Sequence, residues 1–509
     1  MKKLLLVTLD ERPCCFEFQA QMARGTDIQI VKPPRELLPD KKKFADPDKL
    51  YAWMEENAEG CDGCVLAIDA LLYSGLLPSR IHNFSLETLK ERHARIRTFK
   101  ENHPGMLLYA YSTIMRNPRY SSSEQEPDYY EEWGHDIHRW GWITHRKDMN
   151  VADPEELEEL DAINARLPKE FLDDYLGRRA KNTELNKMTI DLAAEGVIDF
   201  LIIPQDDSSP YGLTALDQRV LRKYIREKKI QLKAYMYPDS DGVQGTLVAR
   251  MANHFENRKP LIWIKYASAA GDTVVPMYED RMVDATVKYQ ILACGGIVAS
   301  SAAEADLIVM VNTPSANPRD RLSTPEFVNR IEYDANRNQI ELVEYAAYAI
   351  DVLKKPVCFL DIAFANGGDP ELFWLLREKG LLWKLAGYSG WNTSSNAIGI
   401  ALPSALLYLL YGARPEHVDF LAMRYVEDVA YMDYIRPSML QNEIPAMGLS
   451  YFKVDGENGE VAKIIKAKLQ AFADENISDD EYRIVIDHVY MPWTRMFNNG
   501  IFAHAEPVK

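Results

Sequence analysis

The sequence predicts an α/β fold built on parallel strands, because short apolar runs alternate with helical patterns along most of the chain. The apolar runs are continuous rather than alternating, which is typical of strands that helices cover on both faces. Each run ends in polar or glycine-rich sequence, where a strand gives way to a loop. We expect strands over 4–9, 28–31, 64–68, 106–111, 200–203, 231–236, 261–266, 307–311 and 357–360, and a less regular one over 385–388.

Helical periodicity fills intervals between these runs, as over 86–100, 215–228 and 279–292. One helix start is marked by Asp153, with Pro154 and Glu156 completing the pattern of a capped first turn. Helices between parallel strands form right-handed crossovers. We favour a barrel-like parallel core, although the number of runs also fits a doubly wound sheet or two such sheets.

The chain of 509 residues is long enough for one large catalytic unit with additional regions. We expect an α/β catalytic core over 1–400, with a partly helical insertion at about 117–195. The first part of this insertion is rich in Tyr, Trp and His. After 401 the pattern is mostly helical, so we assign 401–509 to a helical C-terminal region.

Composition excludes several classes of function. The 59 basic and 76 acidic residues give a net charge of −17, which argues against a nucleic-acid partner. The apolar start, 1–9, is too short for a signal peptide and runs directly into charged residues, so it reads as a buried strand. The stretch 397–412 falls short of the roughly 20 residues that span a bilayer. Six cysteines are too few for a disulfide framework, and reduced thiols suit the cytoplasm.

Polar side chains follow most of the expected strands. Because sites in parallel α/β folds form at the carboxyl ends of strands, we expect these side chains to meet in one site for a polar small molecule. The candidate catalytic residues are Asp206, Asp207 and Asp361. The candidate substrate-binding residues are Asp10, Arg12, Asp69, Arg80, Arg116, Tyr211, Asn312, Asn366, Trp391, Asn392 and Asn396.

Four strings resemble those of the bacterial family catalogued as domain of unknown function 4127. They are 69–80 (DALLYSGLLPSR), 205–212 (QDDSSPYG), 361–369 (DIAFANGGD) and 387–396 (GYSGWNTSSN). The resemblance extends over nearly the whole chain and implies a bacterial, single-chain protein of this general length. It implies no activity, so the chemistry must be argued from the residues.

The adjacent Asp206 and Asp207 resemble the tandem acidic pair of N-acetylhexosaminidases, in which the substrate's 2-acetamido group is the nucleophile. This resemblance implies that Asp206 orients the acetamido group and that Asp207 is the general acid. Two adjacent carboxylates in a desolvated site also raise one pKa, as a general acid requires near neutrality. The alternative is a simple turn, because 206–212 is rich in turn-forming residues.

For Trp391, Asn396 and Asp361 a role in the site also has a structural alternative. Trp391 offers an apolar platform for a sugar ring, and Asn392 and Asn396 can bond hydroxyl groups, but Trp391 also fits a core position and Asn396 a helix cap. Asp361 directly ends an apolar run, so its carboxylate needs a partner or a substrate.

Three arginines, Arg12, Arg80 and Arg116, also follow expected strands. A guanidinium binds carboxylate or phosphate through two parallel hydrogen bonds, so these arginines suit an anionic substrate. Alternatively, they pair with Asp10, Asp69 and the other site carboxylates in a structural network.

We expect no metal and no cofactor. His135 and His138 share a helical face, but no matching set of ligands follows them. The segment 239–242 resembles the opening of a calcium loop but lacks its glutamate, and nucleotide-binding glycine motifs are absent from the sequence. A Mg²⁺ ion among Asp206, Asp207 and Asp361 is the main rival, because it leaves little trace in sequence.

These observations favour a cytoplasmic glycoside hydrolase that acts on a small glycoside or oligosaccharide, including N-acetylated ones. Its partner would be a carbohydrate substrate, with neither nucleic acid nor membrane involved. The alternatives are a protein that binds a sugar or polar metabolite without turnover, and a metal- or phosphate-directed hydrolase. The sequence leaves the sugar, the stereochemical outcome and the oligomeric state open.

Overall fold

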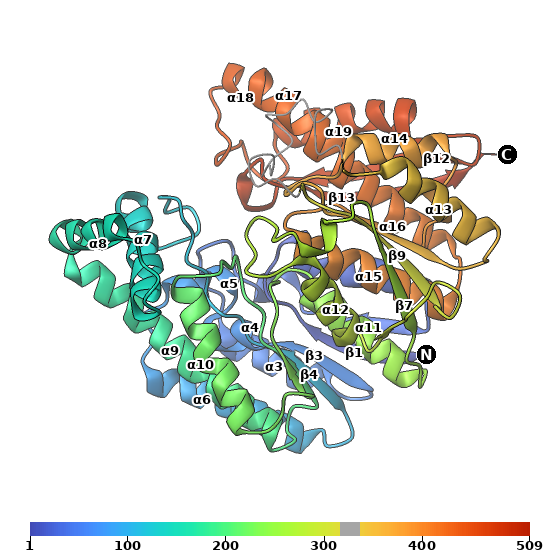
Figure 1. Ribbon diagram of the computed structural model, residues 1–509. Helices are drawn as coiled ribbons and strands as arrows, with labels where there is room; N and C mark the ends of the chain where they lie inside the picture. The colour runs from blue at the N-terminus through green and yellow to red at the C-terminus, as the bar shows by residue number, and fades with distance from the viewer. Residues whose placement is uncertain (316–335, 509) are drawn as a thin grey trace.

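The computed structural model describes residues 1–315 and 336–508 and confirms the α/β class. Its strands form two parallel sheets and a separate antiparallel pair (Figure 1). In spatial order, the first sheet contains β2 (Ile28–Val31), β1 (Lys2–Val7), β3 (Gly63–Ala67), β4 (Leu107–Tyr111), β5 (Phe200–Ile202) and β6 (Ala234–Tyr235). The second contains β11 (Gly387–Ser389), β10 (Val357–Asp361), β9 (Leu307–Asn312), β7 (Leu261–Tyr266) and β8 (Ile297–Val298).

Both sheets are wound in the same order. In the first sheet β1 lies between β2 and β3, and in the second β7 lies between β8 and β9. The chain therefore builds each sheet outwards in both directions from its first strand, which is the doubly wound arrangement. Such sheets bind ligands beyond the carboxyl ends of the strands, near the point where the winding reverses.

The strands do not close into the barrel-like core that we favoured. In the described chain, β6 has only two residues and ends the first sheet. The next strand, β7, pairs with β8 and β9 instead of β6, so it starts a new sheet. Two open sheets result, which was one of the alternatives.

Every predicted apolar run overlaps a strand of these sheets. The runs are continuous because the strands are covered on both faces; all residues of β3 and β9 are buried. Adjacent strands are in parallel register, with Leu4 opposite Gly63 and Cys64 opposite Leu108. The edge strand β8 was not predicted, because its two residues are too few to produce a pattern.

The helices cover the faces of both sheets and form the insertion, where α7 and α8 extend from one side of the molecule (Figure 1). In chain order they are α1 (Pro13–Phe16), α2 (Phe18–Ala23), α3 (Pro47–Asn57), α4 (Ile68–Tyr73), α5 (Leu76–Ile81), α6 (Leu86–Asn102), α7 (Tyr130–Asp148), α8 (Pro154–Arg166), α9 (Lys169–Ala194), α10 (Leu213–Glu227), α11 (Val243–Phe255), α12 (Val283–Ala293), α13 (Gln339–Asp351), α14 (Pro370–Glu378), α15 (Ser394–Tyr411), α16 (Pro415–Arg424), the π-helix η7 (Tyr425–Ile435), α17 (Arg436–Gln441), α18 (Glu443–Ala446) and α19 (Glu460–Phe472).

Helix α15 is the central helix of the molecule and contacts α11, β10 and β11. Within the described residues it is the one helix long and apolar enough to cross a membrane, but 78% of it is buried inside the protein. Burial against the second sheet and α11 is typical of a core helix. The expected domain boundary at 400 falls inside this helix.

The C-terminal region is helical as far as α19 and then forms an antiparallel hairpin that we did not predict. Its strands are β12 (Tyr482–Tyr490) and β13 (Gly500–Pro507), and a bulge between Ile486 and His488 interrupts their register. The loop between these two strands, 491–499, extends to the functional site described below.

Candidate functional site

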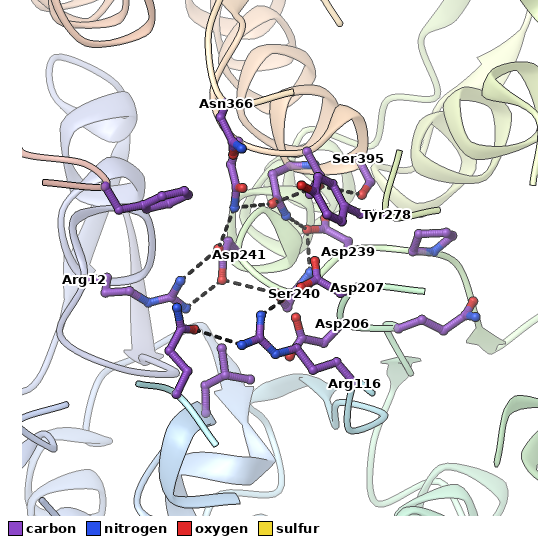
Figure 2. Close-up of a pocket in the computed structure, with 18 of the residues that line it drawn as sticks. Arg12, Arg116, Asp206, Asp207, Asp239, Ser240, Asp241, Tyr278, Asn366 and Ser395 are labelled. Carbon is purple, nitrogen blue, oxygen red and sulfur yellow. Dashed lines mark hydrogen bonds and ion pairs between the residues drawn. The ribbon is translucent and has the colours of Figure 1, made fainter. Parts of the chain in front are cut away.

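A polar pocket of about 220 Å³ lies between the carboxyl edges of the two sheets (Figure 2). The first sheet contributes the segments that follow β1, β3, β4, β5 and β6, and the second contributes those that follow β7, β10 and β11. Sheet topology therefore brings together residues that are far apart in sequence. Eight of the predicted site residues line this pocket: Arg12, Arg80, Arg116, Asp206, Asp207, Asn366, Asn392 and Asn396.

A chain of ion pairs connects Asp206 to Asp207. Arg80 donates to Asp206 at 2.5 Å, and Arg116 donates to Asp207 at 2.8 Å. The fully buried Glu126 lies between the two arginines, and its Oε1 accepts from Arg116 Nε at 2.7 Å and from Arg80 Nη1 at 3.4 Å. Each arginine thus shares its charge between two carboxylates of the protein.

Arg12 is held between two carboxylates, Asp10 and Asp241, at the other side of the pocket. Figure 2 shows its pair with Asp241. Its Nη1 and Nη2 donate to the two oxygens of Asp241 at 2.9 and 2.7 Å, while Nε and Nη2 donate to Asp10. Burial of all three groups makes this a fixed structural clamp. The network alternative therefore describes Arg12, Arg80 and Arg116 well, although Asp69 takes no part in it.

Asp207 is the least constrained of these carboxyl groups. Its side chain is 24% exposed, whereas that of Asp206 is 7% exposed. Burial raises the pKa of Asp207 above its usual value; the charge of Arg116 opposes this rise and the neighbouring Asp206 adds to it. A carboxyl group that is open to a pocket and has a raised pKa is suited to general acid catalysis.

Backbone strain is concentrated at this pocket. Asp207 has φ 35°, Tyr278 has φ 67°, and both Asn366 and Asn392 have φ 61°. Asparagine tolerates the left-handed region, but it costs more for Asp207 and especially for the bulky Tyr278. Such strain persists only where the surrounding structure imposes it, and it is common at functional sites.

Asp239 is a second buried carboxyl group in the pocket wall. Its Oδ1 accepts from the backbone N–H groups of Ser240 and Gly242 and from Asn396 Nδ2, at 2.7, 2.9 and 2.7 Å. Burial nevertheless raises its pKa to about 8. Asp239 therefore carries a proton at neutral pH.

A second, more apolar pocket of about 410 Å³ adjoins the first. It lies beside α7, and Pro118, Trp142 and Met277 contribute to its walls. Tyr120, Asp207 and Tyr278 line both pockets. Asp207 thus lies at the junction between a polar pocket and an apolar one.

Comparison with protein families gives one match. The model of the family described as protein of unknown function (DUF4127) matches residues 4–501. The chain belongs to the DUF4127 family. No curated protein matches this DUF4127 chain, so the resemblance of its Asp pair to N-acetylhexosaminidases stays a prediction.

All four strings that resemble DUF4127 sequences contribute to the polar pocket. Arg80 comes from 69–80, Asp206 and Asp207 from 205–212, Asn366 from 361–369, and Asn392 and Asn396 from 387–396. The four strings are therefore among the segments that form the pocket of this chain.

Three residues predicted for the first sheet lie outside both pockets. Asp10 is buried behind the pocket as a partner of Arg12. Asp69 accepts a hydrogen bond from Thr113 N at 2.9 Å, because it belongs to the first turn of α4 and faces the adjacent loop rather than the pocket. Tyr211 packs edge-on against Trp142, with ring centroids 5.2 Å apart.

Three residues predicted for the second sheet are also outside the pockets. Asp361 is the last residue of β10, where it accepts from Asn312 Nδ2 at 2.8 Å and from the Tyr388 hydroxyl at 2.7 Å. These hydrogen bonds offset the cost of burying the carboxylate that ends the apolar run. Asp361 and Asn312 are therefore accommodated inside the sheet. Trp391 is 1% exposed and packs edge-on against Phe18, which matches its core alternative.

Other pocket residues were not predicted. Asp239 and Asp241 follow β6, so the argument from strand ends applies to them as well, but neither was chosen as a candidate site residue. Tyr278 lies in an irregular segment before α12, and Arg495 comes from the loop between β12 and β13. Nothing in the sequence places that loop beside the sheets.

Among the described residues, Cys14, Cys15 and Asp241 form a group whose ligand atoms lie within 4.8 Å of one another. Burial raises the pKa of both thiols, so they stay protonated. The Arg12 guanidinium contacts both Asp241 and Cys15 Sγ, and its charge opposes a cation there. The rival hypothesis of a Mg²⁺ site required Asp206, Asp207 and Asp361 to lie together. Asp361 does not line the pocket with the other two.

Proposed function

We propose that this DUF4127 protein is a glycoside hydrolase acting on a small glycoside or oligosaccharide, with Asp207 as its general acid. One observation carries the proposal: a carboxyl group with a raised pKa lies where two pockets meet. A sugar bound in the polar pocket and a leaving group in the apolar pocket would put the bond between them next to Asp207. Proton donation to that bridging oxygen is the task of a glycosidase acid.

The polar pocket has the groups that recognise a sugar. Asn366, Asn392 and Asn396 line it with side-chain amides, a group that can both donate to and accept from hydroxyl groups. Asn392 Nδ2 also donates to Asn396 Oδ1 at 2.7 Å, so part of this capacity is used within the protein. The pocket volume of about 220 Å³ is below the roughly 300–1,000 Å³ of drug-sized sites, so it suits a single sugar unit.

The proposed reaction follows the substrate-assisted route for an N-acetylated sugar. The acetamido oxygen attacks the anomeric carbon, the glycosidic C–O bond breaks, and Asp207 transfers its proton to the leaving oxygen. Asp206, which Arg80 holds at 2.5 Å, stabilises the positive charge that develops on the acetamido group. Water then attacks the anomeric carbon, the bond between that carbon and the acetamido oxygen breaks, and the acetamido group is restored. The attacking water gives one proton to the Asp207 carboxylate and leaves its oxygen as the new hydroxyl group of the sugar.

Glu126 has a supporting role in this scheme. Arg116 alone would favour the ionised form of Asp207 and make it a poor acid. Because Glu126 accepts from Arg116 Nε at 2.7 Å, part of the arginine charge is compensated away from Asp207. Burial can then keep the proton on Asp207.

We place this reaction in the cytoplasm, since all six cysteines are free thiols and five of them are buried. The acid and the nucleophile come from the protein and the substrate, so the proposal requires neither metal nor cofactor. A protein that binds the sugar without cleaving it is the alternative, and the experiment below separates the two.

The test compares Asp207→Asn with the wild-type protein on a panel of aryl glycosides that includes N-acetylated sugars. We expect turnover to fall by about 10²–10⁴-fold, which is the usual contribution of a general acid, while sugar binding changes little. Asp217→Asn is the matched control. Asp217 is 21% exposed and pairs with the buried Arg179 at 2.6 Å, but it lines neither pocket.

Wild-type turnover that Asp207→Asn abolishes and Asp217→Asn preserves would support the proposal. Equal turnover of the wild-type and Asp207→Asn proteins would remove Asp207 from the role. A wild-type protein that binds the sugars but cleaves no member of the panel would favour the binding alternative.

A further inference from the structure

Arg495 differs from the other arginines of the polar pocket. Arg12, Arg80 and Arg116 each donate to protein carboxylates, as described above. Arg495 lines the same pocket and is only 3% exposed, yet it forms no hydrogen bond or ion pair with any residue in 1–315 or 336–508. A buried guanidinium without an anion is costly, because desolvation is not offset by a partner.

Two aromatic rings hold the Arg495 guanidinium in place. It lies 4.5 Å from the centroid of Trp493 and 4.9 Å from that of Phe497. Arg12 lies 5.0 Å from the same Trp493 ring. Stacking on ring faces fixes the guanidinium plane and leaves its N–H groups free to donate within that plane.

The loop that carries Arg495 is strained and anchored. Trp493 and Thr494, the two residues before Arg495, both have left-handed backbones, with φ 58° and 50°. Hydrogen bonds from other segments hold this conformation: Val454 N donates to Thr494 O at 2.9 Å, and Met496 N donates to Tyr451 O at 2.8 Å. A strained segment that is held this firmly indicates that the position of Arg495 serves a purpose.

The electrostatic surroundings of Arg495 also lack an anion. Burial, together with the charges of Arg12 and Arg116, lowers its pKa to about 10. The group is therefore still charged at neutral pH. An anionic ligand would relieve this repulsion and satisfy the free N–H groups.

We propose that Arg495 is the anion subsite of the polar pocket and binds a carboxylate or phosphate group of the substrate. The inference rests on the proposed function, from which it takes the substrate to be a sugar. It adds that this sugar carries an acidic group. Carboxylates and phosphates share the chemistry that a guanidinium fork recognises, namely two oxygens that accept parallel hydrogen bonds.

The test is a binding experiment and requires no turnover. Glucose, glucuronate and glucose 6-phosphate, with free phosphate and acetate, are titrated at equal ionic strength while the melting temperature and heat of binding are measured. We expect at least one acidic sugar to bind at least tenfold more tightly than glucose. The acetate and phosphate arms show whether the anion alone suffices, and the two acidic sugars show whether carboxylate or phosphate is preferred.

Arg495→Met removes the charge at similar length, and we expect it to abolish the preference for acidic sugars. Because it also removes an uncompensated buried charge, the ligand-free variant should melt no lower than the wild-type protein. Arg495→Lys should retain part of the preference. Arg414→Met is the control: Arg414 is another arginine whose pKa burial lowers, but it donates to backbone carbonyls away from the pocket.

Equal binding of glucose and both acidic sugars, no binding of any probe, or a preference that survives in Arg495→Met would overturn the inference. These outcomes are separate from those that test catalysis. A protein that binds acidic sugars but cleaves none would contradict the proposed function alone, and a hydrolase of neutral sugars would contradict the anion subsite alone.

Discussion

At the scale of single residues, the site is a set of buried charges whose partners decide their chemistry. The same residue type has different roles according to its contacts: Asp241 is fixed by Arg12, whereas Asp207 keeps an open side and a raised pKa. Glu126 influences the ionisation of Asp207, because its carboxylate pairs with both Arg80 and Arg116.

We expect Glu126→Gln to act on both catalysis and stability. Loss of its charge leaves Arg116 uncompensated, which favours ionised Asp207 and lowers the pKa of that carboxyl group. The basic limb of the activity profile should therefore shift to lower pH, which a pH–rate series measures. Breaking a buried ion network by removing one partner should also cost about 3–5 kcal/mol of unfolding free energy.

Glu131→Gln is a suitable control for that experiment. Glu131 accepts hydrogen bonds from Ser123 in an exposed part of the same region and touches neither arginine. A basic limb that shifts equally in both variants, or moves to higher pH in Glu126→Gln, would be incompatible with the role given to Glu126.

At the scale of elements, the pocket depends on how closely α11 and α15 approach each other. A Cβ atom on Gly399 would lie 2.8 Å from Gly242 Cα and 2.9 Å from Asp239 Oδ2. Glycine is required at both positions because backbone and carboxylate leave no room for a side chain. This contact brings Asn396 of α15 to Asp239, which precedes α11.

Gly399→Ala should therefore separate the two helices. We expect a loss of about 1–3 kcal/mol of unfolding free energy from overpacking, measured by denaturant unfolding, together with weaker sugar binding. Gly177→Ala in α9 is the control, since no atom lies within 4 Å of its added Cβ. It should be neutral or stabilise by up to about 1 kcal/mol. Equal stability of the two variants would show that the helix crossing tolerates a side chain.

The positions of the strands also explain which site residues could be predicted from the sequence. Strand ends could be located from apolar runs, so Arg116, Asp206 and Asn392 were placed correctly around one pocket. Prediction was poorer where a side chain had a local partner: Asp361 also ends a strand, but Asn312 and Tyr388 satisfy it inside the sheet. Arg495 could not be predicted, because its loop reaches the pocket only through tertiary packing.

At the scale of the whole molecule, both sheets direct their carboxyl edges toward one pocket. Carboxyl groups buried at this pocket and elsewhere in the molecule affect the pH dependence of stability. Burial raises the pKa of several carboxyl groups to about 7, and that of Asp239 to about 8. The groups with a pKa of about 7 are Glu11, Asp69, Glu279, Asp361 and Glu427.

These groups retain protons in the folded state that the unfolded chain releases, so stability falls as pH rises through their folded pKa values. Each proton so retained changes the unfolding free energy by about 1.4 kcal/mol per pH unit. Buried histidines with a lowered pKa of about 4, such as His82, His93 and His417, act in the opposite direction, but only below their unfolded pKa of about 6.5. Above pH 6.5 the carboxyl effect is unopposed by these histidines.

We therefore expect the melting temperature to be higher at pH 6.5 than at pH 8.5, as measured by calorimetry in buffers of equal ionic strength. Asp239→Asn should make this decline shallower, because the variant has no proton to lose there. A melting temperature that rises over this interval would contradict the direction assigned to the buried carboxyl groups.

The central claim is that Asp207 donates a proton at the junction of the two pockets. The most direct measurement is kcat/KM of the wild-type and Asp207→Asn proteins on aryl glycosides whose leaving groups differ in acidity. The account predicts a loss of about 10²–10⁴-fold for poor leaving groups such as phenol, and a much smaller loss for dinitrophenol, which departs without a proton. A loss of equal size for every leaving group, or no loss for any, would contradict it.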